Sequence, residues 1–339
     1  MTAVRRAWSG AETGYAADRA AASVRVLMRQ DGSADLADLS SRVTLAALAS
    51  RRGDVTLLHA CGLAAADGSV AAFVGPSGRG KTTVAATLGR HFGYLSDETV
   101  AVAASGEVLA YRKPLSLVRA PDAAKEQVSP VDLGLLARPE AALQIASVIL
   151  LDRSASAPPV PQLRRLSVIE ALPLLVPNLS YLAEQPHGLR MLSELADRIG
   201  GFRSVRYRDA VDLLTITDQL FAPDPAAIES VTASYRHAAA DSPGVHPGAT
   251  GPVYVQRSGV QSLEGPAQTA ALGQEVLHIL GGIGPALWRA LEIPATVAEI
   301  SALVVAELNP PPTDDATDLV ERALAGLVNA GLVTEQRRR

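Results

Sequence analysis

The sequence of 339 residues contains one cysteine, Cys61, which excludes an internal disulfide and a metal site built from cysteines. Aromatic residues are scarce at 4%, and alanine, leucine and valine supply most of the apolar side chains. Hydrophobic residues nevertheless make up 48% of the chain, and charged residues only 19%. This balance predicts a globular chain with substantial buried cores, and the length suffices for about two or three domains.

Long apolar runs are also missing. The longest apolar stretch, Ala171–Ala183, is interrupted by Pro173 and Pro177 and is too short to cross a membrane. Residues 1–22 lack the apolar segment of a signal peptide. The net charge of −4 gives no sign of the basic surface that binds nucleic acid. We therefore expect a cytoplasmic protein with neither a membrane nor a nucleic-acid partner.

Lysine is rare, because it occurs only at positions 81, 113 and 125 among 31 lysines and arginines. The chain uses arginine for almost every other basic position. A lysine that it keeps therefore indicates a position where a compact ammonium group is needed. Lys81 belongs to the stretch Gly75–Thr82, which matches the phosphate-binding pattern G-x-x-x-x-G-K-[ST] at every position. The alternative interpretation is a glycine-rich turn with a chance lysine.

The flanks of this motif favour a phosphate-binding loop (P-loop). An apolar run, Ser69–Val74, predicts a strand before it, and Thr82–Leu88 predicts a helix after it. Such a loop points backbone N–H groups at an anion. Lys81 would reach the β- and γ-phosphates of ATP, and Thr82 would bind Mg²⁺. The predicted nucleotide-binding residues are Gly75, Ser77, Gly78, Arg79, Gly80, Lys81, Thr82 and Thr83.

Such a site also needs a carboxylate to hold Mg²⁺ and, in a kinase, to accept a proton. Asp97 and Glu98 follow soon after the loop's helix, as in a smaller class of P-loop proteins whose next strand follows directly. Asp152 ends the apolar run Val148–Leu151 and fits the general pattern of P-loop ATPases. Two adjacent acids at a strand end are expected to point to opposite faces, which suits one as base and the other as metal ligand.

With these residues, the chain resembles the HPr kinase/phosphorylase family and its smaller bacterial relatives. The matching stretches are Leu58–Ala60, which holds the histidine of a strand, then Gly75–Thr82, Leu95–Glu98 and Tyr111–Leu115. The resemblance implies an α/β P-loop domain of the HPr-kinase type. The family's acid pair is usually Asp-Asp, so the glutamate at position 98 is a departure.

The resemblance also implies roles for single residues. Asp97 would be the general base, His59 would lie near the transferred phosphate, and Lys81 would complete the catalytic set. Thr82, Glu98 and Asp97 would hold Mg²⁺. Arg112 and Lys113 would either contact phosphate or substrate, or form a solvated charge pair. His59 as an ordinary core histidine is the alternative.

We expect four parts along the chain: an N-terminal segment over 1–45 that packs on the kinase domain, the HPr-kinase-like domain over 46–225, a proline-rich linker over 226–252, and a C-terminal domain over 253–334. Strands over 253–257 and 275–280 with three helices, over 283–291, 296–308 and 317–330, predict a winged-helix-like α+β module.

The helix predicted over 296–308 carries Glu299 and Glu307 but no basic residue, which favours a peptide partner over DNA. The module is similar to PqqD-like proteins, which recognise the leader segment of ribosomally made peptides. In such modules the peptide adds a strand to a sheet edge.

The resemblances together predict a kinase that uses ATP and Mg²⁺ to phosphorylate a serine or threonine hydroxyl of a precursor peptide, with the C-terminal domain holding the leader. Two alternatives stay open: an ATPase or nucleotide-dependent binding module in peptide maturation, and a kinase of a small molecule. A homo-oligomer is also left open.

Overall fold

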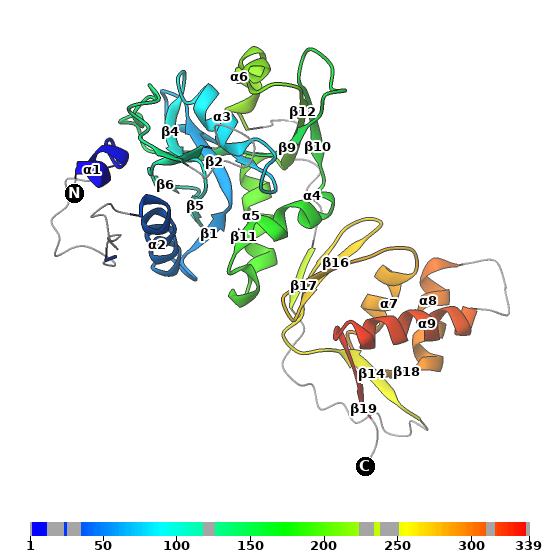
Figure 1. The fold of residues 1–339 in the computed structure, drawn as a ribbon. Coiled ribbons are helices and arrows are strands. Elements are labelled where there is room, and N and C mark those ends of the chain that lie inside the picture. The colour runs from blue at the N-terminus through cyan, green and yellow to red at the C-terminus, as the bar shows by residue number, and fades with distance from the viewer. Residues whose placement is uncertain are drawn as a thin grey trace. The chain divides into compact units, whose positions relative to one another are not determined.

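The structure is a computed structural model that describes residues 2–11, 24–25, 35–117, 126–223, 234–237, 251–309 and 316–336. The fold is mixed α/β, with one mixed sheet, smaller antiparallel sheets and several helices (Figure 1). The chain divides into two compact units. Unit 1 comprises Met1–Ser167, Leu174–Tyr181 and Leu195–Glu229, and unit 2 comprises Val168–Pro173, Leu182–Glu194 and Ser230–Arg339.

Unit 1 is built on a six-stranded sheet with the order β10-β12-β9-β3-β2-β4. Strands β12, β9 and β3 run parallel, and the remaining pairs are antiparallel. Their bounds are β2 (Ala60–Ala64), β3 (Ser69–Val74), β4 (Gly93–Ser96), β9 (Gln144–Arg153), β10 (Gln162–Leu166) and β12 (Phe202–Tyr207).

A smaller antiparallel sheet in unit 1 has the order β11-β1-β5-β6, and β7 pairs with β8. These strands are β1 (Val55–Leu58), β5 (Val100–Ala103), β6 (Val108–Leu109), β7 (Leu115–Leu117), β8 (Glu126–Val128) and β11 (Leu179–Ser180). The helices of the first two thirds of the chain are α1 (Thr2–Ala7), α2 (Leu36–Ala49), α3 (Lys81–Leu88), α4 (Val168–Leu175), α5 (Gly188–Ile199) and α6 (Thr217–Leu220).

Strand pairing brings the ends of several strands to one edge of the six-stranded sheet. Strand β2 pairs with β3 at Ala60 and Val74, and with β4 at Gly62 and Ser96. Strand β9 runs parallel to β3, with Leu150 beside Val74. The carboxyl ends of β3, β4 and β9 and the beginning of β2 therefore lie at the same edge. In open α/β sheets, ligands bind outside the carboxyl ends of the strands.

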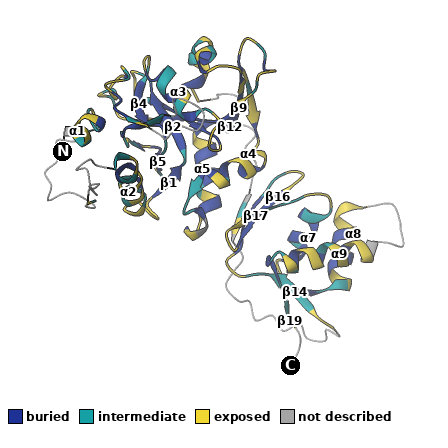
Figure 2. Cartoon of the chain, in the orientation of Figure 1, coloured by how far each residue is buried: buried dark blue, intermediate teal, exposed yellow. Residues whose placement is uncertain are grey.

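The core of unit 1 lies between this sheet and α3. Strand β3 is buried on both faces, as expected for an inner strand whose sequence is a continuous apolar run. Its neighbours β2 and β9 also consist largely of buried residues (Figure 2). Phe73 from β3 and Tyr94 from β4 belong to the same buried cluster as Val84 and Leu88 of α3. This packing fixes the end of β3 and the start of α3, and thus the loop between them.

Unit 2 contains a four-stranded antiparallel sheet, β13-β15-β16-β17, and a three-stranded sheet, β18-β14-β19. Its strands are β13 (Ser234–His237), β14 (Val253–Gln256), β15 (Gln261–Glu264), β16 (Thr269–Gly273), β17 (Val276–Leu280), β18 (Ala295–Thr296) and β19 (Val333–Gln336), and its helices are α7 (Gly284–Ala290), α8 (Val297–Leu308) and α9 (Ala316–Asn329). Trp288, Ile300 and Leu324 join the three helices in one buried core.

The prediction of only two strands for the C-terminal module is wrong, because β15, β16, β18 and β19 form there in addition to β14 and β17. Strands β15 and β16 contain Ser, Ala and Gly, which have low strand propensity, so their pairing depends on tertiary context. Strand β13 lies inside the stretch predicted as a linker over 226–252; most of that stretch lies outside the described residues. Of the predicted segment over 1–45, the structure describes α1 and much of α2. Among the helices of the described ranges, none combines the length and apolar character that a membrane crossing requires.

Candidate functional site

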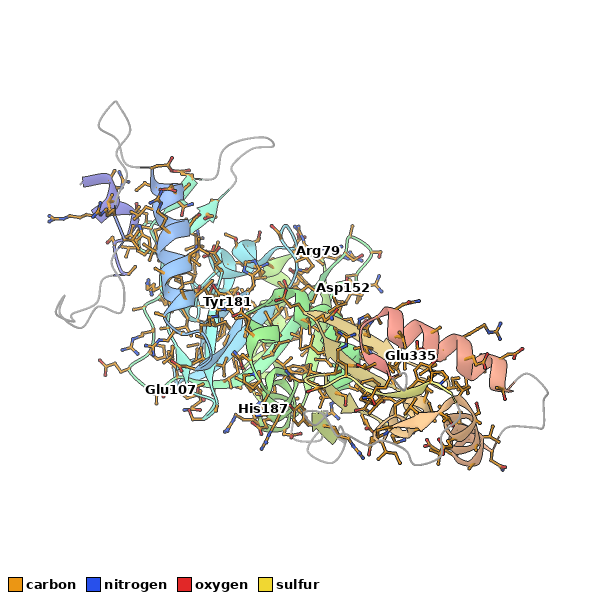
Figure 3. All side chains as sticks on the ribbon, turned by 90° about the horizontal axis from the view of Figure 1, so that it is seen from below. Arg79, Glu107, Asp152, Tyr181, His187 and Glu335 are labelled. Carbon is orange, nitrogen blue, oxygen red and sulfur yellow. The ribbon has the colours of Figure 1, made fainter. Side chains whose placement is uncertain are left out.

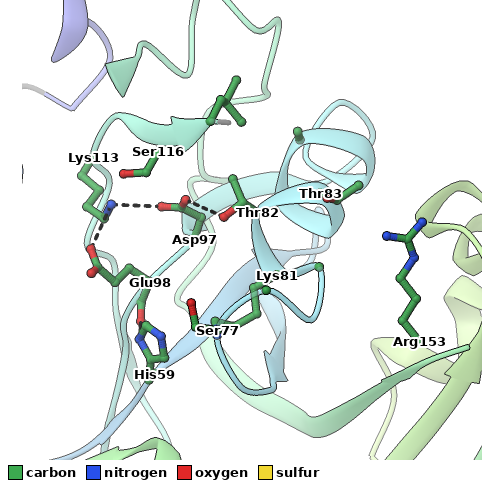
Figure 4. Close-up of a pocket in the computed structure, with 14 residues that line it drawn as sticks. His59, Ser77, Lys81, Thr82, Thr83, Asp97, Glu98, Lys113, Ser116 and Arg153 are labelled. Atoms are coloured by element: carbon green, nitrogen blue, oxygen red, sulfur yellow. Dashed lines mark hydrogen bonds and ion pairs between the residues drawn. The ribbon is translucent and has the colours of Figure 1, made fainter. Parts of the chain in front are cut away.

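A cavity of about 550 Å³ lies at the strand edge defined above (Figure 4). It is lined by residues from the loop after β3, from α3, from the chain that follows β1, β4 and β6, from β7, and from the end of β9. Among its lining residues are His59, Lys81, Thr82, Asp97, Glu98 and Lys113. The three residues predicted as catalytic and the three predicted as metal ligands therefore line one cavity.

The loop between β3 and α3 contains two glycines with positive φ. Gly78 has φ +80° and Gly80, the N-cap of α3, has φ +99°. L-residues rarely adopt this conformation, so glycine is required for the chain to turn from the strand into the helix. A Cβ on Gly80 would also lie 3.0 Å from the hydroxyl oxygen of Tyr207, whereas a Cβ on Gly78 would meet no atom within 4 Å.

Most of the predicted nucleotide-binding residues line the cavity. Ser77, Gly78, Gly80 and Thr83 do so together with Lys81 and Thr82, whereas Gly75 and Arg79 are not among the lining residues. Arg79 is exposed, and its carbonyl oxygen accepts a hydrogen bond from the Tyr207 hydroxyl at 3.4 Å.

Lys81 is the first residue of α3 and is only 7% exposed. Its ammonium group donates hydrogen bonds to the carbonyl oxygens of Gly75 and Pro76, so it lies over the loop that leads into its own helix. Burial lowers the pKa of Lys81, although nearby Asp97 and Glu98 act in the opposite direction. The Lys81 ammonium is thus held beside the loop, where it can bind an anionic ligand of the loop.

Asp97 follows β4 and is buried at 5% exposure. Its Oδ2 accepts from the Thr82 hydroxyl at 3.3 Å, and its Oδ1 accepts from the Tyr94 hydroxyl at 3.2 Å. The two carboxylate oxygens thus have different surroundings. One faces the start of α3, and the other faces the buried aromatic residue of β4.

Lys113 brings the two acids together. Its Nζ lies 3.2 Å from Asp97 Oδ1 and 3.0 Å from Glu98 Oε2 (Figure 4). The prediction that the acids point to opposite faces is therefore wrong. Strand β4 ends at Ser96, and the Ser96 hydroxyl oxygen accepts the N–H groups of Glu98 and Thr99. This bend ends the alternation of a strand before it reaches the acids.

The solvated charge pair considered for Arg112 and Lys113 is also not found. The Lys113 side chain is 2% exposed, and Arg112 donates to the carbonyl oxygens of Tyr94, Leu135 and Leu136. The Arg112 guanidinium also lies 5.5 Å from the centre of the Tyr94 ring. Arg112 thus supports β4 and the segment beside it, whereas Lys113 belongs to the cavity.

The charges of this cluster stabilise one another. Burial alone would raise the pKa of Glu98, but the charge and hydrogen bond of the Lys113 ammonium act against burial, and the pKa lies below its usual value. Burial alone would lower the pKa of Lys113, but Asp97 and Glu98 outweigh it and raise that pKa. Glu98 and Lys113 are therefore both charged at neutral pH.

His59 lies between β1 and β2. The family resemblance had implied a position inside a strand, and this expectation is wrong. Its Nδ1 is 2.9 Å from the carbonyl oxygen of Glu98, so Nδ1 carries the hydrogen and Nε2 keeps a lone pair in the neutral ring. Burial, and then the charge of Lys81, lowers the pKa of His59. A neutral imidazole thus lines the cavity beside the acids.

Asp152, the alternative acid, lies elsewhere. It is near the end of β9, its side chain is 59% exposed, and its Oδ2 is 4.0 Å from Arg206 Nε (Figure 3). It is not among the residues that line the cavity. The next residue, Arg153, does line it, and its guanidinium donates to Asp209 Oδ1 at 3.1 Å.

The sequence analysis left Lys113 as either a phosphate or substrate contact or part of a solvated charge pair, and did not predict its contact with both acids. The signal was present, because the same scarcity of lysine that marked Lys81 applies to position 113. Two of the three lysines of the chain thus lie in this cavity. Lys125 lies outside the described residues.

Within the part of the chain that the structure describes, no group of three or more His, Cys, Asp and Glu side chains forms a metal-binding cluster. A comparison with protein-family models finds no family that matches the chain, and a search of curated proteins finds no match either. The functional assignment therefore depends on the geometry of the cavity and on the sequence motif.

Proposed function

We propose that the chain is an ATP-dependent kinase that phosphorylates a serine or threonine hydroxyl of a ribosomally made precursor peptide. One observation carries the proposal: Lys81 and Thr82 of a glycine-rich loop share a cavity with the carboxylate of Asp97. The loop alone would support nucleotide binding. The acid adds a group that can accept a proton beside the phosphates.

In the proposed reaction, the acceptor hydroxyl gives its proton to Asp97 as its oxygen bonds to the γ-phosphorus of ATP. The bond between the γ-phosphorus and the bridging oxygen breaks, and ADP leaves with that electron pair. The Lys81 ammonium lies against the loop carbonyls and would stabilise the charge of the transferring group. The neutral His59 would contribute a hydrogen-bond acceptor at Nε2, not a positive charge.

The donor set at the cavity fits Mg²⁺, which prefers oxygen ligands and takes one or two carboxylates together with substrate phosphates. The Thr82 hydroxyl and Asp97 Oδ2 are adjacent, and Glu98 supplies a second carboxylate. These residues would hold Mg²⁺, and bound Mg²⁺ would neutralise negative charge on the phosphates.

Unit 2 is proposed to bind the leader of the peptide. Helix α8 carries Glu299 and Glu307 and no basic side chain, which disfavours a nucleic-acid partner. The resemblance of this part of the sequence to PqqD-like modules supports a peptide. A tether of this kind raises the local concentration of the acceptor, so the phosphotransfer site would need little sequence selectivity of its own.

The proposal is tested with the full chain, ATP, Mg²⁺ and a short precursor peptide encoded beside its gene. We expect the intact mass of the peptide to increase by one phosphate. A peptide without its leader should show a raised KM and a similar kcat. ATP hydrolysis with an unchanged peptide mass would instead favour the ATPase alternative, and transfer only to small hydroxyl compounds would favour a small-molecule kinase.

A further inference from the structure

Lys113 has no role in the proposed reaction, yet it is the most enclosed cation of the cavity. Its side chain is 2% exposed, and its Nζ contacts both acids. Its backbone carbonyl oxygen and Asp97 Oδ1 both lie 3.2 Å from the Tyr94 hydroxyl oxygen, so these two acceptors share the single phenolic hydrogen. The ammonium and the phenol of Tyr94 thus hold the same carboxylate oxygen, and Oδ2 is left to face Thr82.

The charges around the acids are balanced without any metal. One ammonium group stands between two carboxylates, so these three side chains carry one net negative charge. Lys81 adds a second positive charge in the same cavity. Among the described residues, the other titratable groups around the acids include His59, Cys61, Tyr94 and Tyr111, and none of these four supplies a further negative charge at neutral pH. Arg153 also lines the cavity, but its charge is paired with Asp209.

An ammonium group and a divalent cation compete for the same carboxylates. A positive charge about 3 to 4 Å from a carboxylate weakens the attraction of that carboxylate for a second cation, most strongly where water is excluded. Asp97 is 3% exposed at its side chain, so water screens this effect little.

We infer that Lys113 is a built-in counter-ion, a positioning residue that holds Asp97 and Glu98 in place and keeps them from binding a free divalent cation. Mg²⁺ then enters the cavity together with the nucleotide, whose phosphates supply the missing negative charge. The inference rests on the proposed function for this last step alone. Binding of the free cation is independent of phosphoryl transfer.

The test is binding of Mn²⁺ to the full chain without nucleotide, followed by electron paramagnetic resonance. The wild-type protein is expected to leave Mn²⁺ free until ATP is added. Lys113→Met should bind free Mn²⁺ roughly tenfold more tightly or better, because the carboxylates lose their counter-ion. Lys113→Arg keeps the charge and should restore the wild-type behaviour. Arg190→Met removes an exposed cation that pairs with Glu194 outside the cavity, and should change nothing.

Equal Mn²⁺ affinity of Lys113→Met and the wild type would overturn the inference. If Lys113→Met does not fold, Lys113→Gln retains a hydrogen-bond donor and replaces it in the same measurement. The measurement on the wild-type protein is also a test on its own, because tight binding of Mn²⁺ without nucleotide would contradict the counter-ion role of Lys113. A failure of peptide phosphorylation would count against the proposed function and would leave these affinities as they are.

Discussion

The Thr82 hydroxyl lies 3.3 Å from Oδ2 of Asp97, although the two residues come from different elements. Thr82 is in the first turn of α3, and Asp97 follows β4. Strand β2 pairs with both β3 and β4 and thereby brings the loop and the acid to one sheet edge. The contact therefore depends on the pairing of β2 with both strands, because a shift in that pairing would displace the loop relative to the acid.

Replacing Asp97 by asparagine should abolish most of the phosphotransfer. Asparagine keeps the size of the side chain but cannot accept the proton, so kcat should decrease by about 10²- to 10⁴-fold. The matched control is Asp152→Asn, because Asp152 is exposed and outside the cavity. It should retain the wild-type rate. Equal losses in the two variants would assign the role to neither acid.

Replacing Lys81 by methionine should reduce the transfer rate by about 100-fold or more, as expected when one charge-stabilising donor is removed from a reaction centre. Lys81→Arg is the matched control for charge. We expect it to remain impaired, because the planar guanidinium does not reproduce a compact ammonium against the carbonyls of Gly75 and Pro76. Full activity of the arginine variant, measured as phosphopeptide formed per minute, would refute this requirement.

His59 should titrate below its usual pKa of 6.5, because burial and Lys81 disfavour the charged ring. The unfolded chain then binds more protons than the folded one as the pH decreases through 6.5, so His59 lowers the stability at acidic pH. The measurement is NMR titration of the ring, assigned by the signal that disappears in His59→Gln. The variant should also lose less stability between neutral and acidic pH. Titration of His59 at or above 6.5 would contradict the expected environment.

Helix α8 of unit 2 begins with a capping box, in which Thr296 and Glu299 exchange hydrogen bonds between side chain and backbone. Thr296→Ala removes one half of this arrangement and should lower the free energy of unfolding by about 0.5–2 kcal/mol. Urea unfolding followed by the fluorescence of buried Trp288 measures the change. Thr317→Ala, at an exposed position inside α9, should leave the stability nearly unchanged.

The candidate loop and acids were predictable because their signals are local. Gly75–Thr82 carries its residues at fixed spacing, with an apolar strand before it and a helix after it. Asp97 and Glu98 stand out because they follow so soon after the helix that the loop begins. Mixed α/β architecture likewise follows from the alternation of strand and helix patterns.

The arrangement of the two acids was not predictable in the same way. Alternation predicted opposite faces, but β4 ends one residue earlier, at Ser96, whose hydroxyl bends the chain. Lys113 enters the cavity from the segment between β6 and β7, far from Gly75–Thr82 in the sequence. No local pattern encodes a contact of this kind, because it arises from tertiary packing.

The most direct test of the proposed function follows the γ-phosphate itself. ATP labelled at the γ-phosphate with heavy oxygen is mixed with excess full chain, Mg²⁺ and the precursor peptide, and the products are analysed by mass spectrometry. If the protein is a kinase with Asp97 as its base, we expect the label on a serine or threonine of the peptide, with ADP formed in equal amount. Label found only in inorganic phosphate, with the peptide unmodified, would contradict it.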